Sequence, residues 1–162
     1  MSEETAPSEE FDPLSNFDPK TYQDALEESL SENTVAEIRH SPHTTIRPHQ
    51  TVAEAIQLLA AQHVSCLLVE QEGKLMGVFS DRDALNKAAL EPENMQRPVR
   101  EVMNANPTYV YDQDPVAAAL CVMAVAGYRH VPVLDLNEKV VGIVSPQRVT
   151  EFLSTHFLAD QL

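Results

Sequence analysis

The sequence predicts an α/β fold built from two copies of one unit, preceded by an acidic extension. Residues 64 positions apart match, since Val35-Ala-Glu-Ile38 aligns with Val99-Arg-Glu-Val102. After a one-residue insertion, Gly77-Val-Phe-Ser80 aligns with Gly142-Ile-Val-Ser145 at a spacing of 65. The insertion coincides with a Gln-Glu-Gly stretch that is typical of a hairpin turn, where changes of length are tolerated. We interpret these matches as an internal repeat.

The repeat divides the chain into segments of different character. One copy is too small to bury both faces of its helices and strands, so the two copies are expected to pack around a pseudo-two-fold axis. The predicted segments are an acidic extension (1–33), repeat 1 (34–90), a linker (91–98), repeat 2 (99–155) and a C-terminal tail (156–162).

Each repeat is expected to contain a short extended piece, a helix, two strands and a second helix. In repeat 1, Thr51 and Glu54 form the pattern of a capping box in front of apolar residues at helical spacing. Gly73 indicates a turn between two short strands. The elements are expected at 44–47, 52–59, 67–69, 75–79 and from 80 onward in repeat 1, and at 108–110, 115–123, 131–134, 140–144 and after 145 in repeat 2.

The extension carries most of the net charge of −14, because residues 1–33 hold ten acidic residues and one lysine. Such a field repels nucleic-acid backbones and anionic lipid, so neither is an expected partner. Tyr22, Leu26 and Leu30 would share one face of a helix. The extension is then a disordered tail, a helix docked on its own module, or a helix that reaches a partner.

Other features point to the cytoplasm. No apolar run approaches the roughly 20 residues of a membrane span, and the first residues lack the basic and apolar parts of a signal peptide. Cys66 and Cys121 are too few for a disulfide framework and are expected to be inert core residues.

The junction Gly77-Val-Phe-Ser80-Asp81-Arg82-Asp83 is the candidate binding site. A helix N-terminus offers free N–H groups to an anion, and a carboxylate in its first turn can accept from two vicinal hydroxyls, as in ribose. The alternative is simple capping, because Ser-x-x-Asp is also a capping pattern.

Comparison of the copies strengthens the binding hypothesis. With two-fold packing, Arg129 and His130 of repeat 2 would lie opposite Ser80 and Asp83 and could bind a phosphate. In the reverse cleft, Arg148 replaces the aspartate and would face the uncharged Ser65 and Cys66. One cleft is therefore predicted to bind a ligand and the other is not.

These features resemble a cystathionine-β-synthase (CBS) domain pair, also called a Bateman module, over about residues 34–153. The matching stretches are Val99–Met103, Asn106–Val110, His130–Asp135 and both Gly-x-x-Ser junctions. The resemblance implies two pseudo-symmetric β-α-β-β-α repeats, and usually a disc-like homodimer of two modules.

The resemblance also implies roles for particular residues. Asp83 would hold the ribose with Ser80 nearby, Thr44 and Ile46 would border the adenine, and Arg129 and His130 would approach the phosphate. The ligand-binding set is Gly77, Ser80, Asp83, Thr44, Ile46, Arg129, His130 and Pro132, and the degenerate second site contains Thr108, Ser145 and Arg148.

Catalysis finds no support in the motifs, so we expect no enzyme and no required cofactor. His40, His43 and His49 match no standard metal-site spacing, and no metal site is expected. The predicted function is a regulatory module that senses AMP, ADP or ATP and acts on an unknown protein partner in trans. The alternatives are a ligand-independent dimerisation or scaffold module and a sensor of an S-adenosylmethionine-type ligand.

Overall fold

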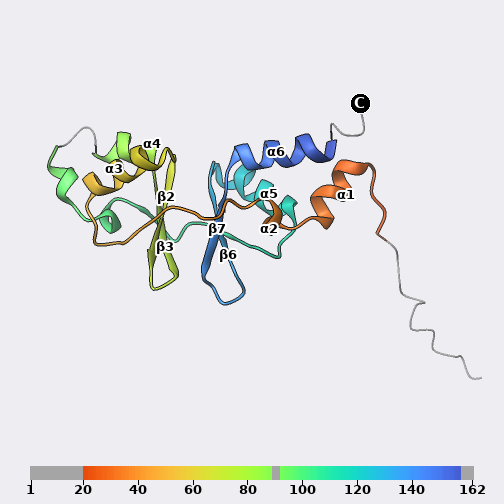
Figure 1. Ribbon diagram of the computed structural model, residues 1–162, viewed down its shortest axis with the longest axis horizontal. Coiled ribbons are helices and arrows are strands. Elements are labelled where there is room, and N and C mark those ends of the chain that lie inside the picture. The colour runs from red at the N-terminus through yellow and green to blue at the C-terminus, as the bar shows by residue number, and fades with distance from the viewer. Residues whose placement is uncertain (1–19, 89–91, 158–162) are drawn as a thin grey trace, which may run out of the picture.

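The computed structural model describes residues 20–88 and 92–157, which form two halves, each with a small sheet and helices (Figure 1). The mixed α/β fold predicted from the sequence is confirmed. One sheet has the strand order β1-β2-β3-β4 and the other the order β5-β6-β7. In both sheets the first two strands are parallel and the hairpin strands are antiparallel.

The first sheet and its helices come mainly from repeat 1. Their elements are β1 (Thr45–Ile46), α3 (Val52–Gln62), β2 (Cys66–Gln71), β3 (Lys74–Ser80), α4 (Asp81–Asp83), a π-helical segment (Ala84–Ala88), two 3-10 segments (Pro92–Gln96 and Val99–Glu101) and β4 (Asn104–Ala105). Strand β4 lies in the opening segment of repeat 2, and it pairs antiparallel with β3.

The second half repeats this order. Its elements are β5 (Val110–Tyr111), α5 (Val116–Ala126), β6 (Val131–Leu134), β7 (Val140–Val144) and α6 (Pro146–Phe157). His40 forms a bridge with Ile143 of β7, at the position that Asn104 occupies beside Val78 in the first sheet.

Local signals in the sequence account for the best-predicted elements. The Thr51 hydroxyl accepts from Glu54 N at 3.2 Å and the Glu54 carboxylate accepts from Thr51 N at 2.7 Å, so the expected capping box is present. Gly73 has φ +82°, a value that favours glycine, and it closes the hairpin between β2 and β3.

The second helix of repeat 1 differs from its counterpart. It contains three α-helical residues and then turns π-helical, whereas α6 is regular over 12 residues. Lys87 occupies the place where repeat 2 has Phe152, a core residue that is 7% exposed. Because a lysine cannot be buried in the same way, this helix lacks one of the apolar contacts that hold α6.

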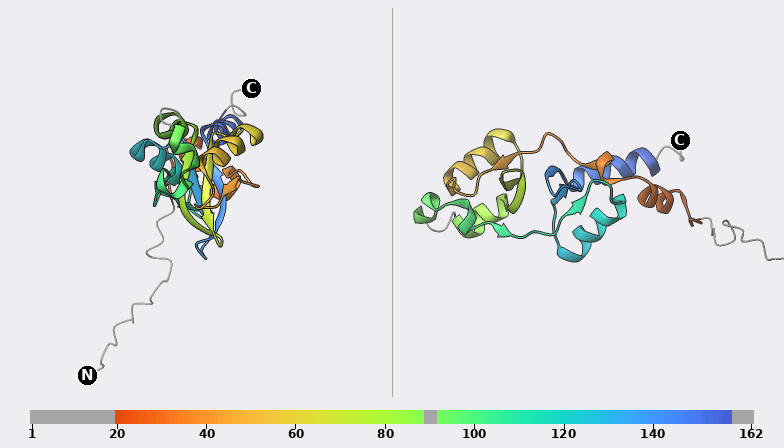
Figure 2. Two further views of the ribbon diagram at one scale, coloured as in Figure 1. Left: turned by 90° about the vertical axis from the view of Figure 1, so that its left-hand side faces the viewer. Right: turned by 90° about the horizontal axis from the view of Figure 1, so that it is seen from below.

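The two repeats exchange their opening segments. Helix α2 (Val35–Ile38) opens repeat 1 but packs in the core of the second half, whereas Val99 and Val102, which open repeat 2, pack in the core of the first. The exchange is reciprocal in detail: Val35 N donates to Asp114 O at 2.8 Å, and Val99 N donates to Gln50 O at 2.7 Å. Figure 2 shows the two chain segments that cross between the halves. Each spatial unit therefore contains a segment that the sequence repeat assigns to the other.

A third apolar cluster joins the two sheets. Cys66, Leu68 and Val78 of the first sheet pack with Ile143 of the second, and all four are buried. The hairpins also meet, since Val140 N donates to Gly73 O at 3.1 Å. These contacts place the two strand-to-helix junctions at the boundary between the halves.

Part of the acidic extension is a docked helix. Helix α1 (Ala25–Glu32) is capped by Asp24, packs against α5 and α6, and places Leu30 on the core of the second half. Of the three alternatives for the extension, the structure shows a helix docked on its own module over these residues. The expectations for 1–19 lie outside the described residues.

Candidate functional site

Two clefts lie at the boundary between the repeats. The Asp83 cleft has a volume of about 280 Å³ and is lined by residues 80–83 and Asn104 of the first half and 126–130 of the second. The Arg148 cleft has a volume of about 500 Å³ and contains Ser65, Ser145 and Arg148. Cys66 and His130 border both clefts.

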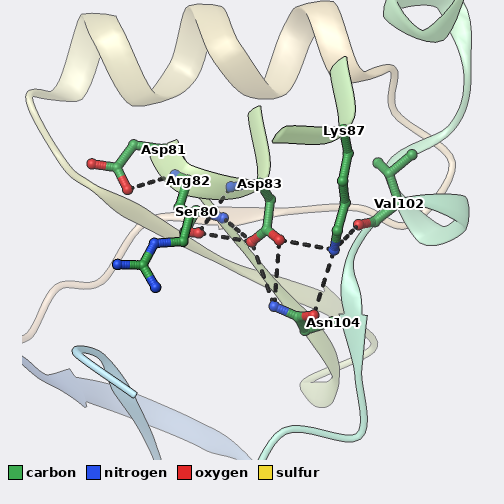
Figure 3. Close-up of polar contacts among 7 residues, drawn as sticks. All are labelled: Ser80, Asp81, Arg82, Asp83, Lys87, Val102 and Asn104. Atoms are coloured by element: carbon green, nitrogen blue, oxygen red, sulfur yellow. Dashed lines mark hydrogen bonds and ion pairs between the residues drawn. The ribbon is translucent and has the colours of Figure 1, made fainter. Parts of the chain in front are cut away.

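Asp83 is held at the end of β3 by a capping box with Ser80 (Figure 3). Its Oδ2 atom accepts from Ser80 N at 3.0 Å and from Ser80 Oγ at 2.7 Å. In return, Asp83 N donates to Ser80 Oγ at 3.3 Å. The capping interpretation is thus confirmed for Oδ2, and the chemistry of the cleft depends on the other oxygen.

The second oxygen of Asp83 contacts a cation. Lys87 Nζ lies 2.8 Å from Asp83 Oδ1, and Asn104 Nδ2 lies 3.5 Å from both carboxylate oxygens. Burial is the largest influence on this carboxyl and opposes its ionisation. The contacts with Lys87 and Ser80 together outweigh burial and hold the pKa of Asp83 below its usual value. The cleft therefore contains an ionised, nearly buried carboxylate.

The opposite wall comes from the end of α5 in repeat 2. Gly127, with φ +68°, ends the helix in the left-handed conformation and leads into Tyr128, Arg129 and His130. Arg129 Nη2 lies 3.8 Å from Asp81 Oδ1 across the cleft, with side chains 59% and 52% exposed. The predicted apposition of this loop with the Ser80–Asp83 junction is observed.

His130 lies deeper than Arg129 in the same loop. Burial, and secondly the charge of Arg129, lower the pKa of His130 from its ordinary value. The imidazole is therefore neutral near pH 7, and Arg129 is the charged group of this loop.

The Arg148 cleft has a different character from the one predicted. His40, His43, His63 and His130 all line it. Arg148 donates to Ile38 O at 3.3 Å and lies 2.7 Å from Glu151 Oε2. Burial, as the largest cause, lowers the pKa of His43. This cleft lacks an aspartate at the junction, as expected, but it is larger than the Asp83 cleft and rich in imidazole groups.

Two predicted site residues are not brought to the Asp83 cleft. Thr44 lines the Arg148 cleft, and the Ile46 side chain is buried in the first core at 2% exposed. The path of the chain explains these positions. His40 pairs with Ile143 of β7, and the residues that follow run from there into β1, which pairs parallel with β2. An adenine contact by Thr44 or Ile46 in the Asp83 cleft does not fit this arrangement.

The remaining predicted residues have other positions. A Cβ at Gly77 would lie 2.8 Å from Asn104 O, so glycine here permits the pairing of β3 with β4. Pro132 is buried in β6, and Thr108 is exposed before β5. Ser145 shares the Arg148 cleft with Arg148.

The two cysteines have opposite environments. Burial raises the pKa of Cys66 to about 12, with smaller contributions from Asp83 and Asp81, so this thiol stays protonated. The expectation that Cys121 is a core residue is wrong, since it is exposed on α5. Helix α5 is apolar on all sides, and such a pattern does not indicate which face is buried.

Two further kinds of feature concern metal ligands and apolar helices. Across 20–88 and 92–157, His, Cys, Asp and Glu residues form no group of three suited to a metal ion. His49 borders a separate hollow beside Ile46, away from His40 and His43. No helix in the same residues has the length and apolar character to cross a membrane.

The sequence reasoning missed three partners of the site: Lys87, Asn104 and the Asp81–Arg129 contact. The i, i+4 spacing of Asp83 and Lys87 is a local signal that could have indicated their ion pair. Asn104 gave no such signal, because it reaches Asp83 through the pairing of β4 with β3.

The fold and its two clefts define a tandem CBS module. The chain belongs to the CBS domain family, whose sequence pattern matches residues 35–89 and again residues 99–155. The resemblance stated from the motifs is thereby confirmed.

Relatives of this chain include short and long proteins. It is 32% identical over 101 residues to the CBS domain-containing protein YhcV of Bacillus subtilis (strain 168), which is 62% of this chain and 71% of that protein. It is 29% identical over 115 residues to the CBS domain-containing protein CBSCBSPB1 of Arabidopsis thaliana, covering 70% of this chain but 21% of that relative. The chain thus spans about a fifth of the plant protein.

A solved structure shares the fold. The crystal structure of CBSX2 in complex with AMP superimposes with a TM-score of 0.64 at 25% identity, covering 73% of this chain and 93% of that chain.

Proposed function

We propose that this protein is a non-enzymatic regulatory module that binds AMP, ADP or ATP in the Asp83 cleft. The observation that carries the proposal is the shared lining of that cleft. Ser80 and Asp83 come from repeat 1, whereas Arg129 and His130 come from repeat 2. A ligand that contacts both walls bridges the two halves of the molecule.

The chemistry of the two walls matches the two ends of a nucleotide. A carboxylate accepts from the vicinal hydroxyls of ribose, and a guanidinium binds a phosphate through charge-assisted hydrogen bonds. Binding across the boundary favours one packing of the repeats over others, which is how occupancy can change the affinity for a partner. The AMP complex of CBSX2 supports this ligand class for the present chain.

Calorimetry tests the proposal. AMP and ATP are titrated into the wild-type protein, Asp83→Ala and Arg129→Ala, and each variant is expected to lose at least about tenfold in affinity, because each loses hydrogen bonds to or from a charged group.

Glu54→Ala is the matched control. It also removes a capping carboxylate, but from α3, outside the Asp83 cleft. The affinity of Glu54→Ala for AMP and ATP should equal that of the wild type. Equal heats of binding for the wild type and Asp83→Ala, or no heat for either, would contradict nucleotide binding in the Asp83 cleft.

One observation favours a second candidate, a ligand of the S-adenosylmethionine type. Asp81 places a carboxylate beside Arg129. A polyphosphate is repelled by Asp81, whereas a sulfonium or ammonium group is attracted to it. Titration with S-adenosylmethionine beside AMP separates these cases, and raised salt should weaken a phosphate contact more than a ribose contact.

The proposal includes a protein partner in trans, a cytoplasmic location and a homodimer. Support for self-association comes from α5, which has no charged residue and exposes Val125 at 89%. Sedimentation should give twice the chain mass for the wild type, and Val125→Glu should shift the protein toward the monomer because it would bury a charge. A monomeric wild type would contradict the homodimer and favour a partner of another kind.

A further inference from the structure

The Lys87 side chain contacts the carboxylate that is proposed to bind the ligand. Its Nζ atom is 2.8 Å from Asp83 Oδ1, the oxygen that the Ser80 capping box leaves free (Figure 3). The Asp83 side chain is 9% exposed and the Lys87 side chain 38% exposed. The carboxylate is therefore nearly buried, and one of its oxygens is already paired with the ammonium group.

A count of acceptor positions shows the conflict. A carboxylate can accept about four hydrogen bonds, two at each oxygen. Ser80 supplies two donors to Oδ2, while Lys87 contacts Oδ1 and Asn104 Nδ2 lies 3.5 Å from both oxygens. A vicinal diol brings two further donors. Only about one acceptor position at Oδ1 is left open, so both hydroxyls can bind only if Lys87 moves away.

Lys87 also holds the segment that connects the two halves. Its Nζ atom donates to Val102 O at 2.9 Å and lies 3.5 Å from Asn104 Oδ1. Val102 belongs to the first core, and the chain continues through β4 into the second half of the molecule. One ammonium group thus ties the binding carboxylate to the connecting segment.

Repeat 2 has no equivalent of this arrangement. Asp83 and Lys87 correspond to Arg148 and Phe152 at the 65-residue spacing, and Phe152 is packed in the core. Lys87 also lies in the π-helical segment, and π-helical turns occur often at functional sites. The lysine is therefore specific to the half that carries the aspartate.

We propose that Lys87 is an internal competitor for the ligand: it occupies Asp83 in the ligand-free protein and is displaced by the ribose. Its displacement frees Val102 O and loosens the connecting segment around Val102 and Asn104. This inference rests on the proposed nucleotide binding at Asp83. It explains how occupancy of the cleft is transmitted to the connection between the repeats.

Calorimetry with AMP on the wild type, Lys87→Met and Lys87→Arg tests the competition. Lys87→Met keeps most of the aliphatic stem and removes the ammonium group, so AMP should bind about fivefold more tightly, in line with the loss of one partly exposed ion pair. Lys87→Arg keeps a cation and should bind AMP less tightly than Lys87→Met.

Lys20→Met is the matched control. It removes a lysine whose ion pair with Glu32 also measures 2.8 Å, but which lies before α1 and outside both clefts. Its AMP affinity should equal that of the wild type, and thermal melting of all variants establishes that they are folded.

Hydrogen exchange tests the transmission. Amides at 102–106 should exchange faster in ligand-free Lys87→Met than in the wild type, and faster in the wild type once AMP is added. Unchanged exchange in Lys87→Met would overturn the link to the connecting segment.

The outcomes separate the two proposals. Wild-type binding of AMP that Lys87→Met leaves equal or weakens would overturn the competition alone. No heat from any of the four proteins would overturn nucleotide binding and this inference with it. Binding by Lys87→Met without detectable binding by the wild type would support the competition most strongly.

Discussion

Asp81 and Arg129 face each other across the Asp83 cleft, one from each repeat. Both side chains are more than half exposed, so the contact at 3.8 Å is screened and weak. Asp81→Asn removes the negative charge beside Arg129 while an amide oxygen can still accept from Arg82 N. We expect AMP to bind about two- to threefold more tightly and ATP to gain more, because ATP brings more charge past this point. Calorimetry with both nucleotides measures the difference.

Asp24→Asn is the control for this charge change. It raises the net charge by the same amount at the N-cap of α1, where asparagine caps as well as aspartate. If Asp24→Asn tightens ATP binding as much as Asp81→Asn does, the effect belongs to the overall charge of the protein and not to the cleft.

His43 predicts a pH dependence of stability. Burial lowers the pKa of His43, with Arg39 and His40 adding to the effect and Glu70 opposing it. A histidine with a lowered pKa in the folded state binds protons more readily when unfolded. Its contribution to the free energy of unfolding is therefore complete above the unfolded pKa of about 6.5 and is lost as the pH falls below that value.

The variant His43→Gln should flatten this dependence. Melting temperatures between pH 7.5 and pH 5 should fall less for His43→Gln than for the wild type. His49→Gln, which changes an exposed histidine outside the Arg148 cleft, should fall as the wild type does. If the melting temperature falls equally with pH in all three proteins, His43 does not contribute to the loss of stability at low pH. His130, whose pKa burial also lowers, would then be the next residue to change.

At the residue scale, sequence reasoning was successful where it compared the two copies. The replacement of Asp83 by Arg148 and the approach of Arg129 from the other repeat followed from alignment and two-fold packing. The position of Thr44 did not follow, because it depends on which edge of β2 the chain reaches after His40. Long-range strand pairing decides that edge, and no local pattern records it.

Single elements show the same division between local and long-range information. The α3 capping box and the Gly73 turn were predictable because each depends on a few adjacent residues. The exposed face of α5 was not, because all its positions are apolar. The π-helical segment after α4 contains Lys87, which contacts Asp83 one turn earlier and Val102 far along the chain, and the second contact has no local signal.

Helix α1 gives a prediction at the scale of the element. No residue of α1 is fully buried, so its attachment depends on few contacts, with Leu30 packed on the second core. Leu30→Ala should lower the free energy of unfolding by about 1 kcal/mol, less than for a fully buried leucine. Urea unfolding measures the loss, and protease sensitivity between residues 20 and 33 should rise.

Glu28→Ala, on the exposed side of the same helix, is the control and should change stability little. If both variants unfold at the wild-type urea concentration, the docked helix contributes nothing to the stability of the module. The extension would then be free to detach and reach a partner.

The whole molecule is held together by the exchange of opening segments. Val35 lies in the sequence of repeat 1 but in the core of the second half, and Val99 lies in the sequence of repeat 2 but in the core of the first. The sequence did not distinguish this arrangement from two independent repeats, because the two segments match each other and could pack on either core. Since both valines are fully buried, each half depends on the other for one layer of its core.

This dependence gives a prediction for a reciprocal pair of variants. Val35→Ala and Val99→Ala should each lower the free energy of unfolding by about 2 kcal/mol, since each removes two buried methyl groups. Hydrogen exchange should locate the damage across the boundary. Val35→Ala should speed exchange in β6 and β7, and Val99→Ala in β2 and β3, so each variant is the control for the other. Faster exchange in β2 and β3 of Val35→Ala would contradict the exchanged arrangement, because it would place Val35 in the core of its own repeat.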